Sequence, residues 1–332
     1  MAPPSLPPPG GGKSGGGGGA ARARGPRSLL LASLVCFCCA LWASLGPSRG
    51  GAAGDVGFAG VSNVRNPGPG ASRLSTALRA IAPAKPEMVR IEADAAAVAA
   101  AVRRCVDEAA EAAIAERGHF ALAIPGGSIL KMLAGSKPEW ASKTTLAYVN
   151  HKCVAMDDAD LATHAKAEKL FLSGWEGVKP ILLSGSADGV AEADAYEAAM
   201  RALPADVLPR AAETGLPEFD LTLIGVGDDG HVGSLYPDRD EVLAKEKWVL
   251  PVAMKDPPSI TLSLPVMTAS KKVVIAACGV SDKYPQGKSD AMKRAIEGEE
   301  DLQSFPAAGL RACATWILDT AAASKLSGGY SQ

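Results

Sequence analysis

The part of this chain that follows residue 86 is poor in paired cysteines and in positive charge. Its four cysteines lie far apart and form no C-x-x-C pair: Cys105, Cys153, Cys278 and Cys313. Isolated thiols of this kind favour small buried side chains in a reducing compartment over a disulfide framework or a zinc site. We therefore expect no metal ion in this part of the chain.

Charge divides the chain into two parts. Residues 1–86 carry nine Lys and Arg and one acid, for a net charge of +8, whereas residues 87–332 carry −10. The acidic part argues against a nucleic-acid partner, because binding to a phosphate backbone needs a basic face. The contrast predicts a targeting presequence over residues 1–86 and one globular domain over residues 87–332. About 245 residues are enough to bury the core of a single α/β unit.

The first 86 residues have the order of a targeting segment. Residues 1–28 are of low complexity and cannot form a packed core. Three arginines then precede an apolar run over residues 29–45, as in a signal peptide or a signal anchor. The acid-poor, Ser/Ala/Arg-rich stretch after it is typical of transit peptides, and Phe58 lies near the expected cleavage region.

Signal-like and transit-like segments in this order resemble a bipartite plastid presequence, so we expect a plastid location. The alternative is a secretory or membrane-anchored protein with a disordered stalk. Membrane contact would be made only through residues 29–45, if they are retained.

Short apolar runs alternate with helical patterns in the body. The runs predict strands at residues 88–92, 120–124, 145–149, 221–224, 248–252, 260–262, 272–277 and 314–318. The patterns predict helices at residues 95–117, 129–133, 161–172, 190–203, 288–297 and 320–326. This alternation predicts an α/β fold with a mainly parallel sheet and helices on both faces. Ligands of such sheets bind in the loops at the carboxyl ends of strands.

One of these loops carries candidate chemistry. Residues 225–237 read GVGDDGHVGSLYP and follow the apolar run 221–224. Glycines such as Gly225, Gly227 and Gly230 let backbone N–H groups approach an anion or a developing oxyanion. His231 can take a proton from water near neutral pH, and Asp229 can fix its tautomer. The alternative is a tight turn that carries a surface histidine.

The whole string resembles the signature of 6-phosphogluconolactonases, G-x-G-x-D-G-H-x-x-S-L-[FY]-P, within the glucosamine/galactosamine-6-phosphate isomerase superfamily. ALAIPGGSILKML at residues 121–133 resembles the phosphate loop of that family. Residues 259–279, 287–298 and 305–322 resemble later segments of the family in the same order. The likeness covers about residues 88–326.

The resemblance implies a fold like that of the sugar-phosphate isomerases and lactonases. It also implies hydrolysis of 6-phospho-D-glucono-1,5-lactone in the oxidative pentose phosphate pathway, without a cofactor. His231 would transfer the proton and Asp229 would support it.

The resemblance further implies a site for the sugar phosphate. Gly126, Gly127 and Ser128 would contact the phosphate through backbone N–H groups at a helix start. Lys288 would add a positive charge, although an exposed lysine at a helix start is the alternative. Lys152 would keep a positive charge where the family has an arginine.

Several positions depart from the family pattern. The D-E-R segment appears as Asn150, His151 and Lys152, and the arginine of R-I-T-L is Ser259. His151 is either a replacement polar group at the cleft or a solvated loop histidine. These changes leave open a catalytically impaired paralogue that binds a sugar phosphate or serves as a protein subunit.

A glucosamine-6-phosphate deaminase or isomerase is less well matched. The loop of those enzymes continues towards N-E-P, and their base comes from a D-E-Y segment. Here the loop continues as S-L-Y-P, and Asn150 stands in place of the base.

Overall fold

The computed structural model describes residues 88–281, 285 and 287–330. The expected presequence, its apolar run and the expected cleavage region all lie outside these residues. Within the described residues, no helix is both long enough and apolar enough to cross a bilayer.

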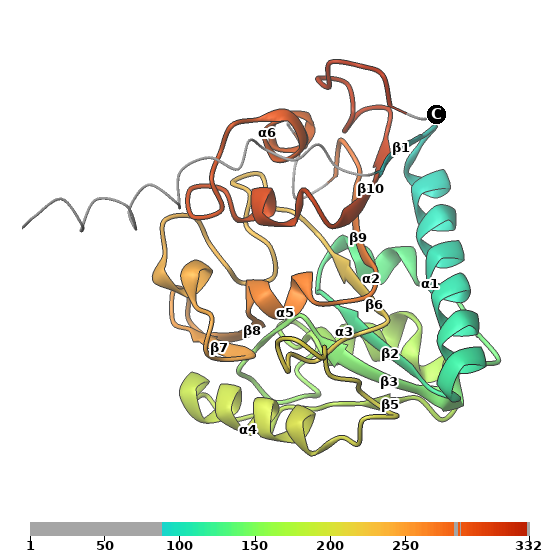
Figure 1. Cartoon of the computed structure of the whole chain (residues 1–332), viewed down its shortest axis with the longest axis vertical. Coiled ribbons are helices and arrows are strands. Elements are labelled where there is room, and N and C mark those ends of the chain that lie inside the picture. Colours follow the sequence, from blue (N-terminus) through green and yellow to red (C-terminus); the bar gives the residue numbers. More distant parts are fainter. Residues whose placement is uncertain (1–87, 282–284, 286, 331–332) are drawn as a thin grey trace, which may run out of the picture. The chain divides into compact units, whose positions relative to one another are not determined.

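A seven-stranded sheet lies at the centre of the fold (Figure 1). Its strand order is β1-β10-β9-β6-β2-β3-β5, and every neighbouring pair is parallel. The strands are β1 (Met88–Glu92), β2 (Phe120–Ile124), β3 (Thr144–Tyr148), β5 (Lys179–Pro180), β6 (Leu221–Ile224), β9 (Val273–Ala277) and β10 (Ala314–Asp319). The predicted parallel α/β sheet is confirmed.

Helices cover both faces of this sheet. One face packs against α1 (Ala95–Arg117), α2 (Ser128–Met132) and α3 (Thr163–Leu170). The other packs against α4 (Gly189–Ala202), α5 (Leu264–Thr268) and α6 (Ser289–Glu297). Four short 3₁₀ helices complete the set described: η1 (Ala141–Lys143), η2 (Leu172–Gly174), η3 (Asp240–Leu243) and η4 (Pro306–Leu310).

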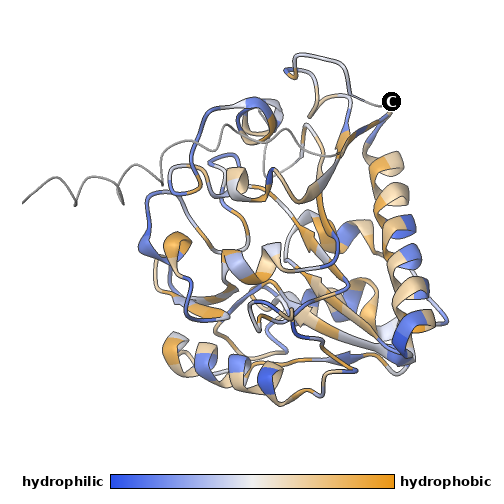
Figure 2. Ribbon diagram, in the orientation of Figure 1, coloured by the Kyte–Doolittle hydropathy of each residue, from blue (hydrophilic) through white to orange (hydrophobic). Residues whose placement is uncertain are grey.

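Alternation along β2 shows why the sheet is buried on both sides. Phe120 and Leu122 pack into the cluster with α1, whereas Ala121 and Ala123 pack into the cluster with α4. All five residues of β2 are buried, so the strand is an apolar run and not an alternation of polar and apolar residues. Figure 2 shows the central strands as mostly hydrophobic, whereas the helices alternate hydrophobic and hydrophilic residues.

Local signals set the ends of α1 where the sequence predicts them. The carboxylate of Asp94 accepts a hydrogen bond from Ala97 N at 2.9 Å and caps the first turn. Gly118 adopts φ 81° and closes the helix with a hydrogen bond to Ile114 O.

A second, smaller sheet was not expected. β4 (Asn150–Lys152), β7 (Val249–Val252) and β8 (Ser259–Leu262) form an antiparallel sheet in the order β4-β8-β7. Two of the predicted strands therefore do not belong to the parallel sheet. Period and apolarity identify a strand, but they do not identify its partner.

The helix predicted at residues 320–326 is wrong, because this segment consists of turns. The carboxylate of Asp319 accepts hydrogen bonds from Ala322 N at 2.7 Å and Gly279 N at 2.8 Å, which fixes a turn at the end of β10. Gly328 and Gly329 follow with positive φ, a conformation that a right-handed helix does not contain.

Candidate active site

Three loops leave one edge of the sheet side by side. β2 pairs with β6 and β6 pairs with β9, all in parallel, so the segments that follow these strands begin next to one another. A Cβ atom placed on Gly225 would lie 3.9 Å from Ile129 in α2. The loop of His231 and the start of α2 are therefore neighbours at the carboxyl edge, where ligands of parallel sheets bind.

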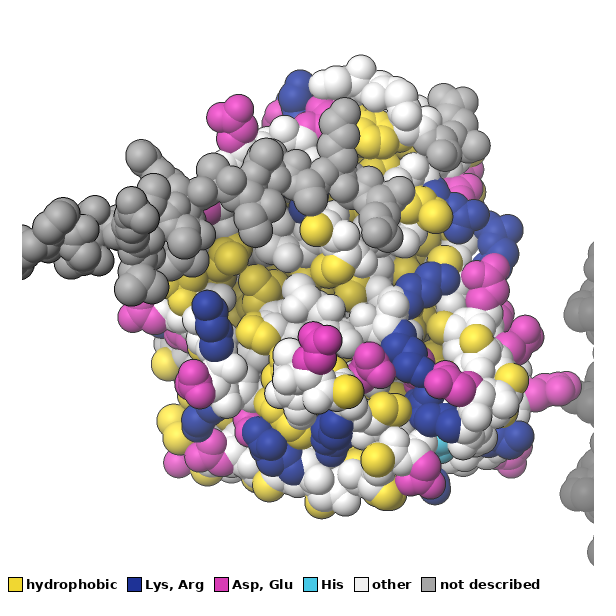
Figure 3. All heavy atoms as spheres, viewed as in Figure 1, with side chains coloured by type: hydrophobic (Ala, Val, Ile, Leu, Met, Phe, Trp, Pro, Cys, Tyr) yellow, Lys and Arg dark blue, Asp and Glu magenta, His cyan; other side chains and the backbone are white. Residues whose placement is uncertain are grey.

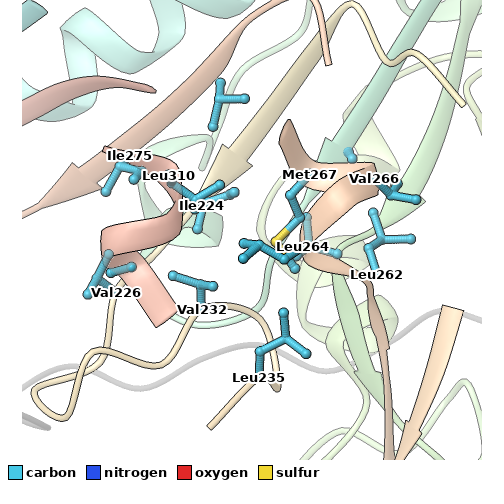
Figure 4. Packing of buried hydrophobic residues seen from close by; sticks show 14 of the residues in the cluster. Ile224, Val226, Val232, Leu235, Leu262, Leu264, Val266, Met267, Ile275 and Leu310 are labelled. Atoms are coloured by element: carbon cyan, nitrogen blue, oxygen red, sulfur yellow. The ribbon is translucent and has the colours of Figure 1, made fainter. Parts of the chain in front are cut away.

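The loop over residues 225–237 is anchored in the core. Val226, Val232 and Leu235 are almost completely buried. Figure 4 shows them together with Ile224 and Leu264 in one hydrophobic cluster. Apolar side chains hold both limbs of the loop, so its polar tip has a defined position.

The polar tip holds His231 and Asp229 as a hydrogen-bonded pair. His231 Nδ1 lies 2.5 Å from Asp229 Oδ1, and the same oxygen accepts His231 N at 3.1 Å. The side chains are 18% and 46% exposed, so both reach solvent. In the neutral ring this pairing places the proton on Nδ1 and leaves Nε2 as an acceptor.

Two opposing effects act on the Asp229 carboxyl. Burial raises its pKa, but the hydrogen bonds from His231 outweigh burial and lower the pKa to about 2. Asp229 is therefore an anion throughout the neutral range and orients the imidazole.

Gly227 makes room for this pair. A Cβ atom at Gly227 would collide with the His231 ring and would lie 2.6 Å from Asp229 Oδ1. The backbone N–H of Gly227 donates to His231 O at 2.9 Å, and Gly230 N donates to Gly227 O at 3.2 Å. These two amides are used within the loop, so the glycines shape the loop and do not offer their N–H groups to an anion.

The segment of Gly126, Gly127 and Ser128 has the expected form. α2 begins at Ser128, Gly127 precedes it with φ 81°, and Gly127 and Ser128 are exposed. A Cβ atom on Gly126 would lie 3.2 Å from Thr163 Oγ1 at the start of α3. The first N–H groups of a helix have no partner within it, so donors are available here.

Lys288 is not the exposed helix-start lysine of the alternative interpretation. It precedes α6, is 7% exposed, and donates from Nζ to Val226 O at 2.7 Å. Its ammonium group therefore contacts the loop that carries His231.

The two departures from the family pattern meet in the small sheet. Lys152 in β4 is the direct cross-strand partner of Ser259 in β8. Two residues along the same strands, Asn150 pairs with Thr261. Asn150 Nδ2 donates to Ser234 Oγ at 3.2 Å, and Thr261 Oγ1 accepts Ser234 N at 3.2 Å. Because side chains alternate along a strand, Lys152 and Ser259 share the face that contacts the loop of His231.

His151 is neither a cleft group nor a solvated histidine. It is 1% exposed, with Nδ1 2.6 Å from Lys152 O and Nε2 accepting His164 N at 3.1 Å. Burial lowers its pKa in spite of the Lys152 carbonyl. Both ring nitrogens are used, so His151 is a neutral structural imidazole that ties β4 to α3.

The sequence interpretation missed one contact of the loop. The Tyr236 ring lies 4.8 Å from the His231 ring at an interplanar angle of 37°. Lys255 Nζ lies 4.6 Å from the centre of the Tyr236 ring. The available signal was the place of Lys255, four residues before Ser259 in the connection from β7 to β8.

Two surface hollows lie elsewhere. One is lined by residues of α1 together with Asp220, Lys271 and Lys272, and the other by residues that include Glu218 and Ala269. These residues precede β6 and β9, so both hollows lie at the amino edge of the sheet. On the face in Figure 3, basic and acidic side chains are interspersed. Among the described residues, no group of three or more His, Cys, Asp or Glu side chains is placed to hold a metal ion.

Two curated relatives are similar to this chain. One, "Probable 6-phosphogluconolactonase 2" of Arabidopsis thaliana, is 34% identical over 65% of this chain and 86% of its own length. Another from the same plant, "6-phosphogluconolactonase 3, chloroplastic", is 30% identical over 64% of this chain and 66% of its own length.

A solved structure shows the same fold. The 6-phosphogluconolactonase of Leishmania guyanensis has a TM-score of 0.60 at 21% identity, covering 73% of this chain and 99% of that one. A family model described as glucosamine-6-phosphate isomerases/6-phosphogluconolactonase matches residues 93–318. That match spans more than half of the chain, so the chain belongs to the glucosamine-6-phosphate isomerase/6-phosphogluconolactonase family.

Proposed function

We propose that this protein hydrolyses 6-phospho-D-glucono-1,5-lactone to 6-phosphogluconate in the oxidative pentose phosphate pathway. The observation that carries the proposal is the His231–Asp229 pair at the carboxyl edge of a parallel sheet, 2.5 Å apart and open to solvent. The names of the relatives support the same reaction.

His231 serves as the proton carrier in this scheme. Its Nε2 takes a proton from water while the water oxygen attacks the lactone carbonyl carbon. The tetrahedral intermediate then collapses, the bond from that carbon to the ring oxygen breaks, and the imidazolium returns the proton to the departing oxygen. Asp229 holds Nδ1 and stabilises the imidazolium between the two steps.

The phosphate end of the substrate is assigned to the neighbouring loops. The exposed amides at Gly127 and Ser128 lie at the start of α2, where the helix dipole favours an anion. Lys288 brings an ammonium group to the β6 loop, and Lys152 lies on the face of the small sheet that contacts this loop. Backbone amides and lysines together provide the charge-assisted contacts that a phosphate needs.

A second candidate is a sugar-phosphate-binding protein with impaired turnover. It is favoured by Ser259, which stands opposite Lys152 without the charge that the family carries there. Deamination is disfavoured because Asn150 is not a base and donates to Ser234.

One assay separates these functions. The purified full chain is given freshly generated 6-phosphogluconolactone beside a His231→Ala variant. We expect hydrolysis well above the spontaneous rate, and a loss of about 10²- to 10⁴-fold in the variant, the usual worth of a general base. No rate above the spontaneous one, with phosphosugar binding retained, would establish the second candidate. Ammonia release from glucosamine 6-phosphate would establish the deaminase.

We also propose a plastid location directed by residues 1–86, which is supported by their signal-like and transit-like order and by a chloroplastic relative. A fluorescent fusion of residues 1–86 should enter plastids, whereas a fusion without residues 29–45 should not. Retention of the complete fusion at a membrane, with release of the fusion that lacks residues 29–45, would contradict the presequence and support an anchor.

A further inference from the structure

A lysine of the connection from β7 to β8 lies near the catalytic candidate, with the Tyr236 ring between them. The Tyr236 ring contacts the His231 ring at 4.8 Å, and the Lys255 ammonium lies 4.6 Å from the centre of the same tyrosine ring. An ammonium group on an aromatic face is attracted by the electron density of the ring, so Tyr236 helps to hold Lys255 here. Lys255 is therefore one ring away from His231.

The connection that carries Lys255 joins two residues that pair across β7 and β8, and one of them is Ser259, where the family has an arginine. β7 ends at Val252 and β8 begins at Ser259, and these two residues are cross-strand partners. On its other side Ser259 pairs with Lys152. Lys255 lies within the connection over residues 253–258, so it leaves the small sheet next to the position where the family has an arginine.

A substrate that carries a phosphate group needs a cation near the imidazole. In the lactone ring the carbonyl carbon C1 and the carbon C5, which carries the C6 phosphate, are bonded to the same ring oxygen. A group that binds the phosphate must therefore be near the imidazole without touching the reacting carbon. The lysine ammonium group is a compact charge that can donate hydrogen bonds to phosphate oxygens. Tyr236 limits its freedom before substrate arrives, which lowers the entropic cost of the contact.

We propose that Lys255, held by Tyr236, binds the phosphoryl group of the substrate in place of the arginine lost at Ser259. This inference rests on the proposed function for the identity of the substrate. It makes Lys255 a determinant of the preference for a phosphorylated sugar acid over the same sugar acid without phosphate.

The test measures binding, so that it does not depend on turnover. Calorimetry compares 6-phosphogluconate with gluconate on the full chain, on Lys255→Met and on Lys245→Met, an exposed lysine before β7 that serves as the control. Loss of one charge-assisted contact should weaken 6-phosphogluconate binding about ten- to a hundredfold in Lys255→Met. Gluconate binding should change much less, and Lys245→Met should match the wild type.

A rescue variant tests whether Lys255 takes the place of the arginine that the family has at the position of Ser259. Adding Ser259→Arg to Lys255→Met should restore most of the affinity for 6-phosphogluconate. Tyr236→Phe should keep the affinity because it keeps the ring, whereas Tyr236→Leu should lose it. Thermal unfolding of each variant checks that the fold is retained.

The inference is overturned if Lys255→Met loses affinity equally for both ligands, if it loses none, or if the wild type shows no preference for the phosphorylated ligand. The proposed function fails separately. If the wild type binds 6-phosphogluconate through Lys255 but does not hydrolyse the lactone, the proposed hydrolase function is wrong. The proposed contact between Lys255 and the phosphate then still stands.

Discussion

The two ends of β6 each carry an aspartate with a cationic or basic partner, and the two pairs differ in kind. Asp220 precedes the strand, is 4% exposed, and accepts Arg117 Nη1 at 2.6 Å and Ala121 N at 2.8 Å. Arg117 Nη2 also donates to it, and Lys271 Nζ lies 3.6 Å away. Asp229 follows the strand, is 46% exposed, and is paired with His231.

The difference separates a structural ion pair from a site of chemistry. At the amino edge the charges satisfy one another, and the side-chain hydrogen bond with Asp220 raises the pKa of Arg117. At the carboxyl edge the acid is paired with an imidazole, and both side chains are open to solvent. A surface hollow lies beside Asp220 at the amino edge, where the charges are already paired with one another.

The largest effect on stability is expected when the buried Asp220–Arg117 pair is broken. Asp220→Ala leaves Arg117 without its main partner and the N–H of Ala121 unpaired. We expect a loss of about 3–5 kcal/mol in the free energy of unfolding, as for other buried ion pairs. Urea unfolding measures it.

Asp229→Ala is the matched change at the other end of the strand. Because Asp229 is half exposed and its pair with His231 is screened by solvent, the free energy of unfolding should fall by only about 1 kcal/mol or less, well below the effect of Asp220→Ala. The lactonase rate of Asp229→Ala should fall, whereas Asp220→Ala should keep its rate per folded molecule. If Asp220→Ala and Asp229→Ala changed stability and lactonase rate equally, the distinction between a structural pair and a catalytic pair would be wrong.

A smaller effect is expected when a side chain is added next to the solvent-exposed Asp229–His231 pair. Gly227→Ala places a methyl group against the His231 ring and the Asp229 carboxylate. Gly227 is not among the glycines with positive φ, so the backbone tolerates alanine. Misplacement of the imidazole by about 1 Å should cost on the order of 10²-fold in kcat.

Gly230→Ala is the contrasting variant in the same loop. Gly230 has φ 86°, and its Cβ atom would lie 2.5 Å from the Phe305 ring, so the fold itself must yield. We expect a fall in the unfolding midpoint for Gly230→Ala and little change for Gly227→Ala. The reverse order would show that the loop is not anchored as described.

The smallest effect concerns the titration of Asp229. His231 lowers its pKa to about 2, so in His231→Ala the pKa should rise towards 3.8, because the hydrogen bond from the imidazole is lost while the backbone N–H of residue 231 remains. A pH titration of the carboxyl carbon by NMR measures this. Since the folded-state pKa is depressed, the stability from the pair is present above pH 3.8 and is lost as pH falls through about 2. An unchanged midpoint in the variant would show that His231 does not hold the carboxylate.

Much of the fold followed from local patterns. The bounds of α1, β2 and β6 agree with the structure because caps, apolar runs and glycines mark them within a few residues of chain. The likeness to the lactonases, confirmed by the family match, came from the loop over residues 225–237. The assignment of individual site residues stays a prediction.

The sequence by itself determined the alternating α/β order, the His231–Asp229 neighbourhood and the family, because each depends on residues close together in the chain. Only the tertiary structure decided that Lys152 faces Ser259, that Lys288 reaches Val226 O, and that Lys255 lies on Tyr236. These contacts join segments that are about 20 to 100 residues apart, and their geometry depends on which strands pair and how loops pack. The periodicity of apolar residues along the chain does not indicate which strands pair or how the loops pack.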